Sequence, residues 1–512
     1  AIRYDLEYRN KLSVGLRMEK DPGEPLLVPS QVWSVKYQQP DMLAGYVMIR
    51  QVGAVQSLIL GNYRVNFGYG INLSGSQMGI RSRNGMSGMA ERISPQTSVS
   101  ETGFLRGLAC RISLGKFSIS CFGSIQNLDG NSVVYDSLTG KPISFSSIDK
   151  SGLHRSSTEL SGRDNIQEKL AGGFIVYRHN WFKAGIIAIY NQFNAHQTAN
   201  DRPYARFEQT GRENFITGFA TTIWLPRMQF MGEISVSKNK GKALLTGLQL
   251  NPVPGIMVSF AYRNFSLDYQ NHYGSGYISS GKNSDEKGIQ CKLRIEMPRK
   301  YNIEILADES RSAWVSYDLA SPSEKTEFRG TLEKAWPKTG SLNFSLAYIN
   351  SKIENPALSE WICHTEYFSQ YKIRLECRIE ATEHVRFKSR IETNFTRNGV
   401  PGYLLFQDIE YITGWKDLKI WVRICQFDIR NYDNRITAYE NDVQYDFSSF
   451  MHYGKGLRGI LMVKLHPLSM MDLWIRFSTV YYTNKNIGTG WDEIGGCRQN
   501  EIEIQARFKW PD

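Results

Sequence analysis

The sequence predicts an all-β protein, and three observations carry this prediction. Almost every segment of the 512-residue chain alternates apolar and polar side chains with period two, the spacing of a β-strand. Aromatic residues make up 12% of the chain, and they favour strands, as do the Ile, Val and Thr residues that accompany them. No apolar run approaches the ~18 residues that a membrane-spanning helix requires. The chain should therefore fold mainly as β-sheet.

The stretch 105–125 shows the strand register most clearly. A two-residue turn at Gly115 and Lys116 would place Leu114 opposite Phe117. One face of this hairpin is then wholly apolar, whereas the other face is mixed and carries serines and an arginine. The apolar face comprises Leu108, Cys110, Ile112, Leu114, Phe117, Ile119 and Cys121. We expect this face to contact either a protein core or lipid.

Cys110 and Cys121 lie directly opposite each other in this register. They could form a cross-strand disulfide, or they could stay reduced as small apolar residues that face lipid, which is the favoured interpretation. The chain has seven cysteines without C-x-x-C spacing, so no zinc ribbon is predicted.

Charged stripes on later strands decide between core and lipid. In two neighbouring strands and in the last strand, charged residues gather on one face and apolar residues on the other. The charged faces comprise Lys372, Arg374, Glu376, Arg378, Glu380, Arg386, Lys388, Arg390, Glu392, Glu501, Glu503, Arg507 and Lys509. An unpaired buried charge costs several kcal/mol, so such a stripe cannot enter an apolar core, but it can line a wet lumen.

The apolar face of the last strand should then contact lipid. This face comprises Ile502, Ile504, Phe508 and Trp510. The aromatic, amphipathic end resembles the assembly signal of bacterial outer-membrane barrels, although Pro511 and Asp512 follow it here. The charged and apolar faces together predict a large antiparallel transmembrane β-barrel.

Short and long connections alternate along the chain. Tight turns are expected near Asn10, Gly53, Gly115, 179–181, Pro226, 298–300, Glu383, Trp415 and Pro467. Long loops are expected around 74–98, 129–163, 195–208, 269–285, 355–362 and 483–497. This alternation is typical of outer-membrane barrels, with short periplasmic turns and long extracellular loops. We expect about 24 strands, and residues 1–512 should form a single barrel domain because no linker divides them.

The strand directions add an expectation about closure. If the tight turns share one rim, the first strand and the last strand both run toward that rim. Two strands that run the same way cannot close an antiparallel barrel. We expect an odd number of strands to come from sequence upstream of Ala1 or from another chain, unless one hairpin is misplaced.

Sequence motifs give no support for catalysis. The eight histidines are scattered without H-x-x-x-H spacing, so no metal site is predicted. Residues 276–283 imitate a phosphate-binding loop, but Asn283 replaces the required Ser or Thr. We therefore expect a non-enzymatic protein without a cofactor. The net charge of +11 permits contact with anionic lipid head groups, and no nucleic-acid partner is expected for this segment.

An acidic stripe stands out near the end of the chain. Glu440, Asp442 and Asp446 should point inward from one strand. They could bind cations or a basic peptide, or they could pair with Lys and Arg stripes across the lumen, which is the favoured interpretation.

Several stretches resemble one family of Bacteroidota outer-membrane proteins, in which a helix-hairpin-helix domain precedes a large barrel. The matching stretches are Leu12–Leu16, Glu19–Glu24, Leu60–Gly70, Phe104–Gly107, Tyr439–Val443 and Gly488–Ile494. The resemblance implies a barrel, an outer-membrane location and a small helical domain encoded upstream. This sequence begins inside the barrel, so the helical domain is not part of it.

Two functional hypotheses follow. In the first, the barrel is a membrane anchor or a subunit of an envelope transport, secretion or assembly complex. In the second, it is a channel or gated transporter for polar or macromolecular cargo, including DNA uptake through the upstream helical domain that the resemblance implies. Both hypotheses expect contact with outer-membrane lipids, lipopolysaccharide and envelope proteins. A loop that fills the interior would favour the anchor, and a continuous aqueous path would favour the channel.

Overall fold

The computed structural model describes residues 1–510 except 21–41, 75–87, 155–156, 277, 280–282, 355–364, 398, 484–486 and 489–492. One antiparallel sheet of 26 strands dominates these residues, and two further sheets have two strands each. This confirms the predicted fold class and the predicted number of about 24 strands. In the described part of the chain, no helix is long and apolar enough to cross a membrane.

The chain divides into two compact units. Unit 1 contains residues 1–250, 259–290 and 310–323, and unit 2 contains residues 251–258, 291–309 and 324–512. β17 (Ile256–Phe265), β18 (Glu286–Met297) and β19 (Tyr301–Arg311) contribute residues to both units. Each unit is therefore a stretch of one sheet with its own packed segments.

Unit 1 contains most of the short elements. Its members are β1 (Ile2–Tyr8), β2 (Leu12–Glu19), β3 (Met42–Val52), β4 (Val55–Gly68), β5 (Ala90–Pro95), β6 (Leu105–Leu114), β7 (Phe117–Leu128), β8 (Gly130–Asn131), β9 (Val134–Tyr135), β10 (Pro142–Phe145), β11 (Ser147–Ile148), α1 (Ser157–Gly162), β12 (Ile166–Arg178), β13 (Phe182–Gln197), η2 (Pro203–Ala205), β14 (Gly211–Leu225), β15 (Met228–Ser237) and β16 (Lys242–Leu250). Its long strands pair antiparallel, whereas the short β10 pairs parallel with β13.

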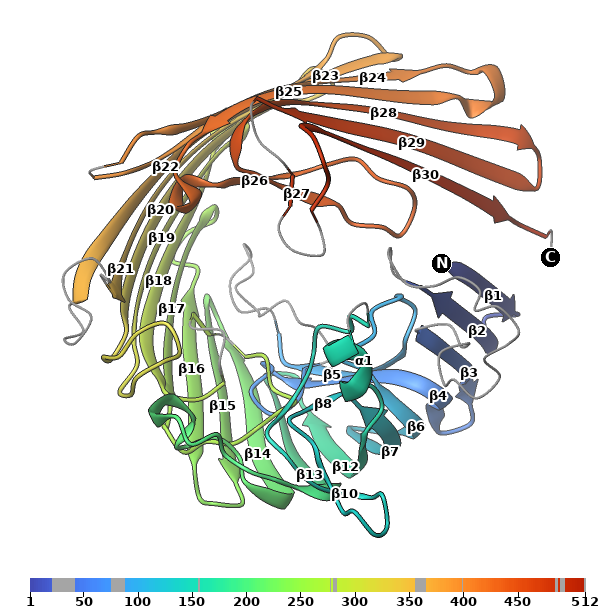
Figure 1. Cartoon of the computed structure of the whole chain (residues 1–512), viewed down its shortest axis with the longest axis vertical. Coiled ribbons are helices and arrows are strands. Elements are labelled where there is room, and N and C mark those ends of the chain that lie inside the picture. Colours follow the sequence, from blue (N-terminus) through green and yellow to red (C-terminus); the bar gives the residue numbers. More distant parts are fainter. Residues whose placement is uncertain are drawn as a thin grey trace. The chain divides into compact units, whose positions relative to one another are not determined.

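Unit 2 consists mainly of long strands. Its members are η3 (Pro298–Lys300), β20 (Glu324–Trp336), β21 (Gly340–Glu354), β22 (Thr365–Glu380), β23 (Val385–Thr396), β24 (Gly402–Ile412), η4 (Trp415–Asp417), β25 (Lys419–Ile429), η5 (Tyr432–Asn434), β26 (Ile436–Tyr439), β27 (Ser449–His452), β28 (Gly454–Leu468), β29 (Met471–Tyr482) and β30 (Arg498–Phe508). Figure 1 shows β26 and β27 set apart from the row of long strands.

The predicted hairpin at 105–125 is confirmed in its register. β6 and β7 pair Leu114 with Phe117 and Cys110 with Cys121, and Gly115 takes the positive φ of 59° that a tight turn needs. Leu108, Leu114 and Phe117 are exposed. Cys121 is also exposed, and Cys110, Ile112 and Ile119 are half-buried. Both thiols are free.

The tight turns lie between strands where the sequence predicts them, with one exception. Pro467 lies within β28, and the turn to β29 falls at Ser469 and Met470. The register shifts between Leu465 and Leu468, because Pro has no N–H to donate to the ladder and is accommodated at an irregularity.

Three predicted loops contain regular structure, among them 195–208, which contains η2 and the last residues of β13. β5 lies within the predicted loop 74–98 and pairs with β4, and the part at 75–87 is outside the described residues. The predicted loop 129–163 contains β8 to β11 and α1. These strands are two to six residues long, which is too short for a periodic pattern to stand out in the sequence. The predicted loop 355–362 is also outside the described residues.

The two faces of the long strands differ as the period-two pattern predicts. In β13, Ile187, Ile189 and Phe193 are buried, whereas Ile186 and Tyr190 are exposed. We call the face with the buried side chains the inner face of each unit. The outer face presents large apolar side chains to its surroundings in both units, which is how a sheet meets lipid.

The last strand keeps this alternation but ends earlier than predicted. Ile502, Ile504 and Phe508 are exposed, whereas Glu503, Gln505 and Arg507 on the other face are half-buried. β30 ends at Phe508, so the predicted strand residues Lys509 and Trp510 follow it instead. β1 pairs with β2 and β30 pairs with β29. The closure of the sheet by further strands stays a prediction.

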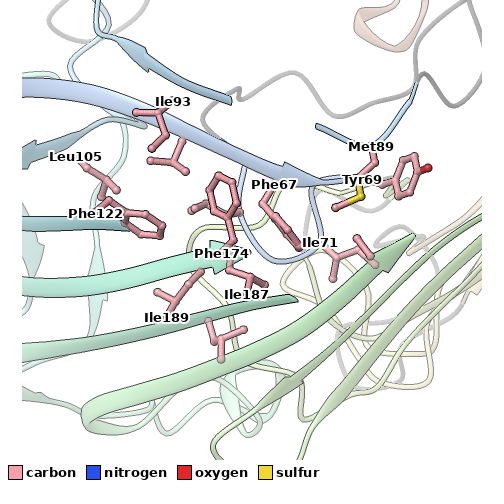
Figure 2. Close-up of a cluster of buried hydrophobic side chains, with 14 of the residues drawn as sticks. Phe67, Tyr69, Ile71, Met89, Ile93, Leu105, Phe122, Phe174, Ile187 and Ile189 are labelled. Atoms are coloured by element: carbon pink, nitrogen blue, oxygen red, sulfur yellow. The ribbon is translucent and has the colours of Figure 1, made fainter. Parts of the chain in front are cut away.

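Unit 1 has a large apolar core on its inner face. Phe67 from β4 lies against Phe174 from β12, with ring centroids 5.2 Å apart. Figure 2 shows Tyr69, Ile71 and Met89 near them, from segments that connect the strands. Chain segments between strands thus turn inward and supply the apolar surface that the inner strand residues need.

The apolar outer face can be tested at β30. Ile504→Arg should lower the free energy of unfolding by about 2–4 kcal/mol if Ile504 lies at mid-membrane depth, because it places a charge in lipid. Gln505→Arg should cost less than about 1 kcal/mol, because Gln505 is half-buried on the inner face and an arginine N–H can also donate to the Gln444 carbonyl. Urea titration in lipid vesicles measures both. Equal losses would show that the faces are assigned wrongly.

Candidate functional site

The charged stripes on β22 and β23 form a ladder of ion pairs. The register places Arg374 opposite Glu392 and Glu376 opposite Arg390. Both pairs have N–O distances of 2.7 Å. Glu376 also lies 2.9 Å from Arg378. Charges of opposite sign on neighbouring strands stabilise each other, and the three acidic residues of the two stripes offset half of their six basic charges.

The other charged residues of the two stripes lie next to these ion pairs along β22 and β23. Lys388 lies 3.5 Å from Glu376, and Arg386 lies 3.5 Å from Glu410 on β24. Lys372 stands opposite Asn394, and Glu380 stands exposed opposite Arg386. The structure therefore pairs Lys388 and Arg386 with carboxylates, whereas Lys372 and Glu380 form no ion pair within the described residues.

The acidic stripe does not lie on one long strand. The sequence predicts a strand that carries Glu440, Asp442 and Asp446, but β26 ends at Tyr439 and the three carboxylates follow it. β26 pairs with β27 alone, in a two-stranded sheet apart from the large one. We call residues 436–452 the inner hairpin. The prediction of a long strand fails because a short hairpin has the same period-two pattern as a membrane strand.

Glu440 is the most densely bound carboxylate of the inner hairpin. It is fully buried and accepts two hydrogen bonds from Arg458 of β28, at 2.6 and 2.7 Å. Arg476 of β29 donates a third, at 2.9 Å. Arg423 of β25 donates from Nη1 to the Tyr439 carbonyl at 2.6 Å, and from Nε and Nη2 to the two carboxylate oxygens of Asp408. Three arginines of the large sheet thus hold the tip of the hairpin.

Arg476 connects the hairpin to the last strand. It lies 3.8 Å from Asp442 and 3.5 Å from Glu501, and it also bonds Glu503. Asp442 bonds Ser448 within the hairpin, and Asp446 is bonded to the Phe447 backbone N–H at 2.9 Å. Arg507 and Lys509 both bind Asp472 of β29.

Apolar contacts and a histidine hold the other end of the inner hairpin. Ile436 and Ala438 are buried in a cluster with Phe406 and Phe427 of the large sheet. His452 is 1% exposed, and its Nδ1–H donates to the Ile436 carbonyl at 3.3 Å. Burial, with the positive charges of Arg458 and Arg423, lowers the pKa of His452 from 6.5 to about 4.

Unit 1 also has a segment that turns inward, but here the carboxylate belongs to the sheet and the donors belong to the segment. Glu233 of β15 accepts hydrogen bonds from the backbone N–H groups of Tyr69, Ile71 and Asn72, the last at 3.0 Å. The Asn72 side chain donates another at 2.7 Å. A Cβ at Gly68 would lie 2.7 Å from this carboxylate, and Gly68 has a φ of 68°. The sequence analysis missed Glu233, and the nearest signal was the Gly68–Gly70 spacing.

A cavity of about 270 Å³ opens among the loops of unit 1. Glu168 lines it, and Gln126 donates to the Glu168 carboxylate at 3.1 Å. Asp129 and His154 also line it and lie 3.0 Å apart. Lys150 lines another side and donates to the His272 carbonyl at 3.3 Å. The cavity is lined by acidic and basic side chains.

The described residues contain no group of three or more His, Cys, Asp or Glu side chains placed to hold a metal ion. The phosphate-loop imitation at 276–283 lies partly outside the described residues.

No protein-family model matches the chain, and no curated protein matches it. Among solved structures, it is similar to the siderophore receptor PirA from Acinetobacter baumannii, at 8% identity and a TM-score of 0.46, over 99% of this chain and 79% of that chain. It is also similar to the outer membrane protein OpdK from Pseudomonas aeruginosa, at 8% identity and a TM-score of 0.33, over 77% of this chain and 99% of that one. A third similar structure is OccAB3 from A. baumannii, at 8% identity and a TM-score of 0.31, over 67% of this chain and 93% of that chain.

The Glu440 cluster should fix the inner hairpin. Glu440→Gln should lower the opening free energy of the hairpin by about 3 kcal/mol, because it leaves Arg458 buried without its carboxylate. Hydrogen exchange of the 436–452 amides measures this energy. Glu296→Gln is the control, because its ion pair with Arg294 is exposed and should contribute less than about 1 kcal/mol. Similar exchange in both variants would contradict the assignment.

The buried His452 should make the hairpin sensitive to acid. Its pKa is lowered in the folded state, so the opened state binds more protons between pH 6.5 and 4. The stabilising contribution is complete above pH 6.5 and is lost as the pH falls toward 4. His452→Gln should flatten this dependence, measured as the pH profile of amide exchange at 436–452. An unchanged profile would assign the acid sensitivity to other groups.

Proposed function

We propose that the chain is a non-enzymatic outer-membrane β-barrel protein that acts as a membrane anchor or as a subunit of an envelope complex. The outer-membrane location is supported by the outer face of the long strands. Residues such as Ile186, Ile424 and Ile504 are exposed there, opposite an inner face with paired charges. Such a face is stable in lipid and would aggregate in water.

One observation carries the choice of an anchor over an open channel, namely the inner hairpin. It lies on the inner face of unit 2, and β25, β28 and β29 each contribute an arginine that binds its tip. A segment with fully buried charges and its own apolar cluster fills space that a channel would leave to water. The inward segment bound by Glu233 does the same in unit 1.

A gated transporter is the second candidate. The cavity of about 270 Å³ in unit 1 supports it, because Glu168, Lys150 and His154 bring charges of both signs to an enclosed surface. A polar cargo could exchange with such pairs. In this alternative, the inner hairpin would be a gate that moves.

Single-channel conductance separates the two candidates. The purified wild-type protein in a planar bilayer should give no stable open steps. A variant in which a Gly-Ser linker replaces residues 436–452 should conduct ions, because it lacks the inner hairpin that covers the inner face of unit 2. Stable steps in the wild type would reject the anchor in favour of the channel. Mass spectrometry of the same preparation should find envelope proteins in stoichiometric amounts.

A further inference from the structure

Unit 2 contains a second cavity, of about 350 Å³, between the tip of the inner hairpin and the large sheet. The hairpin contributes Tyr439, Asn441 and Asp442. The sheet contributes Lys419 and Trp421 from β25, Met462 and Lys464 from β28, and Trp474 from β29. The volume falls in the range of small-molecule sites, about 300–1,000 Å³.

Two lysines of this cavity face each other, and neither forms an ion pair with a carboxylate of the described residues. The register of β25 and β28 places Lys419 directly opposite Lys464. Within the described residues, neither lysine has a carboxylate within 4.0 Å. Like charges directly opposite on neighbouring strands destabilise a sheet. Elsewhere on the inner face of unit 2 most charges are paired, so this lysine pair departs from the rule.

The nearby carboxylates are already engaged. Asp472 of β29 is buried and binds Arg507, His466 and Lys509, the last at 3.1 Å. Asp442 lies 3.8 Å from Arg476 and bonds Ser448. The end of the inner face at Lys419 and Lys464 therefore carries excess positive charge.

The two tryptophans have different positions relative to the lysines. Lys464 Nζ lies 5.1 Å from the centroid of the Trp474 ring, a cation–π contact that places the ammonium group. Trp421 is two residues from Lys419 on the same face of β25 and is half-buried at the cavity. An aromatic ring beside a pair of cations suits a ligand that has both an anionic group and an apolar ring.

We propose that this cavity binds a small organic anion, with its carboxylate or phosphate between Lys419 and Lys464 and its ring against Trp421. The anion would lie between the two lysines, where no carboxylate of the described residues is within 4.0 Å of either ammonium group. The binding site is independent of the choice between anchor and transporter, because it rests on the register of β25 and β28 and on the position of the hairpin tip.

Isothermal titration of the purified full chain in detergent tests the site, with benzoate, phenyl phosphate and inorganic phosphate as probes. The wild type should bind the ring-bearing anions saturably. Lys419→Met and Lys464→Met should each weaken that binding about tenfold, because each removes a charge-assisted hydrogen bond. Trp421→Leu should weaken binding of the ring-bearing probes and leave inorganic phosphate unchanged. Tighter binding of benzoate or of phenyl phosphate identifies a carboxylate or a phosphate ligand.

Lys455→Met is the matched control. It removes the same charge from the other end of β28, where Lys455 lies 3.6 Å from Asp428, and should leave binding unchanged. Lys464→Arg should retain binding, which separates loss of the cation from loss of the fold. An equal loss in Lys455→Met would show non-specific attraction and overturn the proposal. The absence of saturable wild-type binding at millimolar probe concentrations would also overturn it.

Discussion

The pairing of charges on the inner face is the constraint on which the rest of this structure depends. A sheet that gives its outer face to apolar side chains must place its charges on the other face, where segments of the chain bury them. Burial is tolerable only when each charge has a partner. Arg374, Glu376, Arg390 and Glu392 find these partners on neighbouring strands of the sheet. Glu440 of the inner hairpin finds its partners, Arg458 and Arg476, on the large sheet.

Much of the fold could be predicted because strands have a strict period. The register of β6 and β7 follows from the sequence, since a shift by one residue would turn Leu114 and Phe117 to the other face. The inner hairpin could not be recognised in this way. Its alternation of Ile436 and Ala438 with Thr437 and Tyr439 is the same as that of a membrane strand. Only its partners distinguish it, and those lie far away in the sequence.

The sequence predicts some of the charged residues of the candidate site but not their ion-pair and hydrogen-bond partners. Sequence analysis singled out Glu440 and Asp442, because acidic residues alternate there, but could not identify Arg458 and Arg476 as their partners. Glu233 was missed altogether. Its partners are mostly backbone N–H groups of residues 69–72, and a backbone group carries no sequence signal. A lone Glu in a strand looks the same whether it binds backbone, a cation or water.

The ion pairs of the inner hairpin determine where it docks on the sheet, but they contribute little to the net free energy of docking. If the hairpin left unit 2 for water, Glu440 would regain hydration, and this gain would offset much of the lost attraction to Arg458. The apolar cluster has no such compensation, since exposing Ile436, Ala438 and Phe427 costs free energy in proportion to their area. The Glu440 pairs would then select one docked position, and the apolar cluster would supply the net stability. A filled interior is the expected resting state of such a design, whether the hairpin is a permanent part of an anchor or the gate of a transporter.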